Sequence, residues 1–183
     1  RDIELVHVLG HARSIVRLLE DASKGVQKIS LDENGDVIEL RGSAKTNRQC
    51  EGWSEEDREN GDAGQLELTL PIEDSAIRKV VFGNLDGCRF EGDRGPASLS
   101  ASTALSLGHD VPLLELDFDR FVLVTLKGDL AHDDEKQEID FDFRVDADLF
   151  TEVRVPAEGG DVVFGTDTEE RALLLRAANG SFC

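Results

Sequence analysis

Polar and apolar residues alternate strictly in the stretch EIDFDFRVDADLF, from Glu138 to Phe150. Successive side chains of a β-strand point to opposite faces, so the pattern predicts one strand with an apolar face and an acidic face. The apolar parity holds Ile139, Phe141, Phe143, Val145 and Ala147, and the polar parity holds Asp140, Asp142, Arg144, Asp146 and Asp148.

Apolar residues recur at helical spacing between residues 3 and 22. This stripe predicts an amphipathic helix, assigned to an N-terminal segment 1–24, that lies on an apolar surface. Gly10 has low helix propensity, so an alternative is that the residues before it are extended and the helix begins near His11. Gly25 is the expected end of the helix. A membrane-surface helix is rich in basic residues, and here Arg13 and Arg17 are the only clear ones flanking the stripe, so we expect the helix to dock on protein rather than on a membrane.

Residues 26–44 have the pattern of a β-hairpin that turns at Asn34-Gly35, since both turn residues tolerate positive φ. Residues 49–64 then form a long acidic loop.

Short alternating segments dominate the rest of the chain and give about ten strands with frequent turns. No alternation of strands with helices is visible, so the predicted fold is all-β, an antiparallel jelly roll or β-sandwich occupying residues 26–183 as a single domain. The expected strands are 65–72 with Pro71 marking the end, 77–82, 88–91 after a turn at 84–87, 112–118, 121–128, 138–150, 150–155 and 161–165. An acidic loop is expected at 130–137. Two further segments, 97–108 and 172–178, are expected to be strands or short helices.

Composition adds an unusual charge to this picture. The 183 residues are 39% hydrophobic and carry a formal net charge of −19. Such a surface repels nucleic acid phosphates, and no apolar run is long enough to span a bilayer. We expect no retained secretory signal, and the start at Arg1 without Met leaves open whether the numbering begins inside a longer product. Excess acid, arginine over lysine and few large aromatics resemble proteins of salt-accumulating archaea, in which concentrated salt screens the carboxylates. An ordinary acidic protein is the alternative interpretation.

Cysteines and histidines supply few candidates for chemistry. Cys50, Cys88 and Cys183 are widely spaced without a CxxC motif, so we interpret Cys50 and Cys88 as small core residues and leave their pairing open. His7 and His11 are four residues apart but lack the glutamate of an HExxH motif, so packing is the favoured role.

Two acidic stretches could hold a hard cation. His132, Asp133, Asp134 and Glu135 form one of them, for which a solvated loop is the favoured interpretation. The stretch from Asp32 to Asp36 has the spacing of an EF-hand loop but lacks its glycine at the sixth position, so the hairpin is favoured. The sequence therefore predicts no catalytic, cofactor or metal site and no enzyme.

Size, charge and strand pattern across the whole chain resemble the smaller major capsid protein of haloarchaeal icosahedral viruses with an internal membrane. That resemblance implies a single vertical jelly roll that self-associates and also pairs with a second, larger capsid protein in the virion, without nucleic acid contacts. It also implies assembly in a high-salt cytoplasm and possible contact with the internal membrane or its proteins. The family implies no catalytic residues and no cofactor.

A carbohydrate-binding or adhesion β-sandwich of a haloarchaeon is the alternative. Such sites use exposed aromatic residues, and Trp53 in the acidic loop is the candidate, since the nine phenylalanines lie mostly at inward parity. Asn179-Gly180-Ser181 matches a glycosylation sequon, which matters only for an exported chain.

Overall fold

A computed structural model describes most of the chain. The described residues are 2–36, 42–50, 56, 59–60, 63–92, 95–118, 122–145, 150–155, 162–167 and 172–176.

One long helix, α1 (Asp2–Ser30), opens the chain. It passes through both Gly10 and Gly25, so the expected stop at Gly25 is wrong. The last turns are held by tertiary contacts: Val26 is buried, and the Gln27 side-chain amide donates to the Leu113 carbonyl at 2.8 Å. Such contacts override the low helix propensity of glycine.

The hairpin expected over residues 26–44 is wrong in its first arm, because residues 26–30 belong to α1. The turn itself is present. Gly35 has a φ of 83°, and its N–H donates to the Asp32 carbonyl at 3.1 Å. Residues 37–41, which would form the returning arm, lie outside the described residues.

The strands that follow are all paired antiparallel. They are β1 (Gly42–Gln49), β2 (Gln65–Glu73), β3 (Ala76–Ile77), β4 (Val80–Gly92), β5 (Gly95–Ser106), β6 (Val111–Pro112), β7 (Val122–His132), β8 (Glu135–Val145), β9 (Phe150–Val155), β10 (Val162–Asp167) and β11 (Ala172–Arg176).

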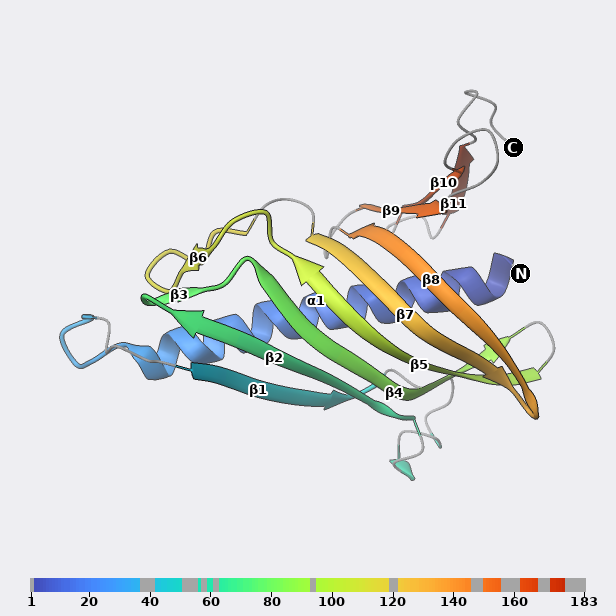
Figure 1. The fold of residues 1–183 in the computed structure, drawn as a ribbon, viewed down its shortest axis with the longest axis horizontal. Coiled ribbons are helices and arrows are strands. Elements are labelled where there is room, and N and C mark those ends of the chain that lie inside the picture. Colours follow the sequence, from blue (N-terminus) through green and yellow to red (C-terminus); the bar gives the residue numbers. More distant parts are fainter. Residues whose placement is uncertain are drawn as a thin grey trace.

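The described strands join in one sheet whose order largely follows the chain (Figure 1). The order is β11-β10-β9-β8-β7-β5-β4-β2-β3-β6, with β1 paired to the other edge of β2. The prediction of a mostly β, antiparallel fold with an N-terminal helix is confirmed. The Greek-key crossings of a jelly roll are not established by this order.

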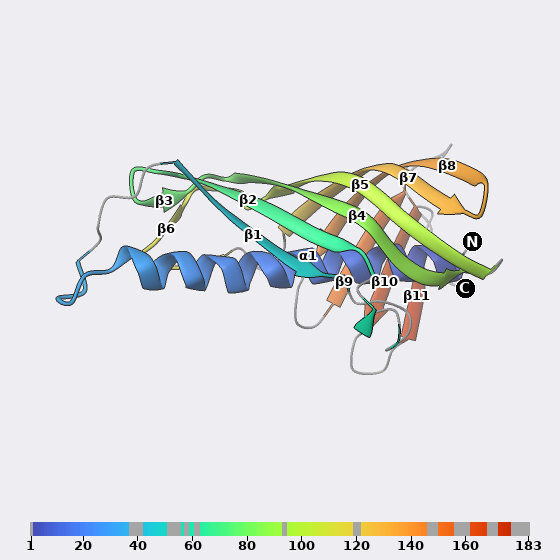
Figure 2. The same ribbon diagram turned by 90° about the horizontal axis from the view of Figure 1, so that it is seen from below.

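The molecule has two layers: the sheet, and α1 lying along one face of it (Figure 2). Apolar side chains of α1 pack on the inner sides of the strands, as expected for a helix that docks on protein. The helix contributes Val8, Leu9, Ala12, Ile15, Val16, Leu18, Leu19 and Val26, and the sheet contributes among others Leu66, Leu68, Leu70, Leu85, Leu99, Leu105, Leu126 and Phe143.

Several strand boundaries differ from expectation. The turn predicted at 84–87 is wrong: β4 is continuous, and a β-bulge between Leu85 and Cys88 accommodates Gly87 at a φ of 61°. Bulges and turns use the same residue types, so the sequence signal is ambiguous. Pro71 does not end β2, which runs on to Glu73.

The acidic loop predicted at 130–137 is also wrong. β7 and β8 pair up to His132 and Glu135, and Asp133 and Asp134 alone make the turn. The expected strand 112–118 shrinks to the two residues of β6. In the segments 97–108 and 172–178, for which helix remained open, residues 97–106 and 172–176 are strands.

The alternation predicted for residues 138–150 is confirmed within β8. Ile139, Phe143 and Val145 are buried, whereas Asp140 and Asp142 are exposed on the outer face. Asp146 and Asp148 lie outside the described residues.

A disulfide joins Cys50, at the end of β1, to Cys88 in β4. Both residues are buried, with exposed fractions of 1% and 0%. They are core residues as expected, and their pairing, which the sequence left open, closes a loop over a sequence separation of 38. Cys183 lies outside the described residues.

We predict that replacing both bridged cysteines (Cys50→Ser, Cys88→Ser) lowers the free energy of unfolding by about 4 kcal/mol. The bridge restricts the conformations of the unfolded chain, and for a closed loop of this length the lost restriction has about that value. Urea denaturation of the double variant tests this. Cys183→Ser is the control, because it leaves the bridge intact, and equal midpoints for all three proteins would contradict the prediction.

Two glycines are expected to respond oppositely to alanine. A Cβ at Gly128 would collide with the Ser100 carbonyl oxygen and with Ala101, whereas one at Gly25 meets nothing within 4 Å. Gly25→Ala should therefore stabilise the protein by about 1 kcal/mol through helix propensity, and Gly128→Ala should destabilise it by about 2 kcal/mol through overpacking. Thermal denaturation of both variants measures the two signs, and a stabilising Gly128→Ala would refute the close approach.

Candidate functional site

Histidines of the helix meet an aromatic ring of the sheet near the start of α1. The His7 ring stacks on Phe90 of β4 with centroids 5.2 Å apart, and His11 lies tilted at 6.2 Å from the same ring. Phe90 is buried, and the β4–β5–β7 register places Ala97 and His132 beside it on the inner face. The helical spacing of four thus brings both histidines onto the side that faces the sheet.

His11 is the most perturbed member of this cluster. Its exposed fraction is 4%, and its Nε2 is buried without a hydrogen-bond partner. Burial, with a smaller contribution from the charge of His7, lowers the pKa of His11 to about 4, and burial also lowers the pKa of His7. Both histidines are therefore neutral packing residues at neutral pH, as the sequence favoured.

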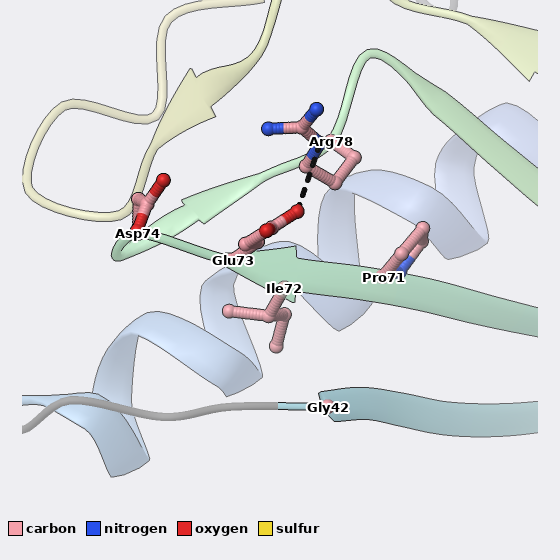
Figure 3. A pocket seen from close by; sticks show the side chains of 6 residues that line it. All are labelled: Gly42, Pro71, Ile72, Glu73, Asp74 and Arg78. Atoms are coloured by element: carbon pink, nitrogen blue, oxygen red, sulfur yellow. Dashed lines mark ion pairs between the residues drawn. The ribbon is translucent and has the colours of Figure 1, made fainter.

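A hollow of about 510 Å³ lies at the other end of the sheet, where β2 turns into β3 (Figure 3). It is lined by Gly42, Pro71, Ile72, Glu73, Asp74 and Arg78. The β2–β3 turn is tight, and its residues Asp74 and Ser75 both have positive φ, of 51° and 58°.

Arg78 dominates the chemistry of this hollow, and two carboxylates share it. Its Nε is 3.6 Å from Glu73 Oε2, and one terminal nitrogen is 3.1 Å from Asp110 Oδ2. The other oxygen of Asp110 accepts from the Lys79 N–H at 2.8 Å. These side chains are 39–66% exposed, so the pairs are solvated and contribute little energy. The arrangement anchors the β3 turn and offers an anion no unshared positive charge among the lining residues.

A second, shallower hollow of about 430 Å³ lies on the outer face of the sheet. Its polar lining comes from four strands, with Glu67 and Asp86 towards β2 and β4 and Lys127 towards β7. Between them Ser100 accepts from the Gly87 N–H at 3.0 Å, and Ser102 donates to the Lys127 carbonyl at 3.3 Å. The lining carries charges of both signs on opposite sides of β5.

The two acidic stretches considered as cation sites form turns. Asp32 Oδ1 accepts from the N–H groups of Asn34 and Asp36 at 2.9 and 2.8 Å, so its carboxylate closes the turn, as the non-EF-hand interpretation expected. Asp133 has a φ of 47° in the β7–β8 turn between His132 and Glu135. Within the described part of the chain, no cluster of three or more histidine, cysteine or acidic residues has the arrangement of a metal site.

Several sequence candidates lie outside the described residues: Trp53, Asn179, Ser181 and Cys183. None of the helices in the described residues combines the length and apolar character required to span a bilayer.

Comparison with known proteins found no matching family model, no similar curated protein and no similar solved structure.

The sequence analysis missed a surface feature, namely large apolar side chains that point outward. Phe82 is 59% exposed on β4, and Leu123 is 54% exposed on β7. The signal was present as consecutive apolar residues at Val80–Phe82 and 121–124, which place apolar side chains on both faces of a strand. Phe82 is thus an exception to the expected inward parity of the phenylalanines.

We predict that acid destabilises the fold through His11. A histidine in the unfolded chain binds a proton near its ordinary pKa of 6.5, but the folded one does so only near 4, so stability is retained above pH 6.5 and falls between pH 6.5 and 4. The loss from this group is ~3 kcal/mol. Denaturation midpoints between pH 7 and about 4 measure the slope.

His11→Gln removes the titrating group and should flatten this slope, with His109→Gln, an exchange at an exposed site outside the cluster, as the reference. A slope that is unchanged in His11→Gln would contradict the assignment.

Proposed function

We propose that the protein is a non-catalytic structural subunit that self-associates into a repeating assembly in concentrated salt. The observation that supports this most is the exposure of large apolar side chains on a strongly acidic surface. Ile29 is 67% exposed and Leu114 is 60% exposed, in addition to the outward Phe82 and Leu123. Scattered exposed apolar residues are ordinary, but surfaces that gather them serve as contacts.

Charge determines the conditions under which such contacts form. Two chains that each carry −19 repel one another over a Debye length of about 30 Å at 0.01 M salt and only about 3 Å at 1 M. Apolar attraction remains in concentrated salt. The subunits therefore associate when salt is high and separate when it is withdrawn.

The specific form of this proposal is the one that the viral resemblance implies: the smaller major capsid protein of a haloarchaeal virus, paired with a larger capsid protein in the shell around an internal membrane. Chain length, net charge and a β-rich fold with one N-terminal helix support it. The jelly-roll topology belongs to this specific form. The general role as a self-associating subunit does not depend on it.

The Cys50–Cys88 disulfide bears on where the chain folds. Protein thiols stay reduced in most cytoplasms, so a buried disulfide favours an oxidising compartment. This weighs against the cytoplasmic assembly that the resemblance implies, whereas a virion or cell-surface location is compatible with the bridge.

We predict that the purified protein sediments as large particles in molar KCl and as a small species in millimolar KCl. Sedimentation velocity in both buffers, followed by electron microscopy of the heavy fraction, tests the proposal. Closed shells would support the capsid form, and filaments or sheets would support the structural role while contradicting the capsid form. A monomer at both salt concentrations would contradict the proposal as a whole.

A variant with fewer outer carboxylates is the matched probe of the charge argument. Asp140→Asn combined with Asp142→Asn removes two exposed acids from β8 and should move assembly to lower salt. A shift to higher salt would contradict repulsion as the limiting force.

A further inference from the structure

We draw no further inference here: the strongest candidate, the uncharged strip along β5 on the outer face of the sheet with Phe82 and Leu123 exposed beside it, carries none because nothing in the structure shows what covers it.

Discussion

The contact between the apolar stripe of α1 and the inner face of the sheet is the constraint on which the rest of the structure depends. A single sheet has two faces, and one helix can cover only one of them. Leu9, Ile15 and Leu19 on the helix and Leu68, Leu99 and Leu126 on the strands are all nearly or completely buried in this contact. No second layer of described residues covers the outer face, so the composition of that face matters for how the protein meets its surroundings.

Close approach between backbone segments keeps the inner face compact. A side chain at Gly83 or Gly128 would collide with the backbone of a neighbouring strand. Glycine at these two positions therefore lets the strands approach closely. The Cys50–Cys88 bridge then fixes the end of β1 against the β4 bulge, and the Arg89 N–H donates to the Ala63 carbonyl at 3.0 Å beside it. Two buried polar atoms, His11 Nε2 and Thr103 Oγ1, remain without hydrogen-bond partners and lower the stability of an otherwise apolar core.

Alternation of side chains was enough to predict the antiparallel sheet, because it reports directly on which face of a strand is buried. It placed Ile139 and Phe143 inward and Asp140 outward correctly. The errors arose where distant contacts decide local structure. The end of α1 depends on Gln27 bonding to the Leu113 carbonyl 86 residues away, and Asp86-Gly87 suits a bulge as well as a turn. The helical spacing was enough to predict that His7 and His11 share one face of the helix. Their contact with the Phe90 ring could not be predicted, because it depends on how β4 is aligned with the helix.

The outer face of the sheet is the observation behind the proposed self-association. Some polar side chains there pair in solvent, as Lys127 does with Asp140, and others bond to the backbone, as Ser100 and Ser102 do. Yet Phe82 and Leu123 remain exposed beside a strand with no charge. Water solvates such a strip poorly, and a second sheet would bury it as the inner face is buried by α1. Within the described residues the two-layer fold thus leaves one apolar strip uncovered, and the proposed self-association would cover it while the acidic remainder stays hydrated.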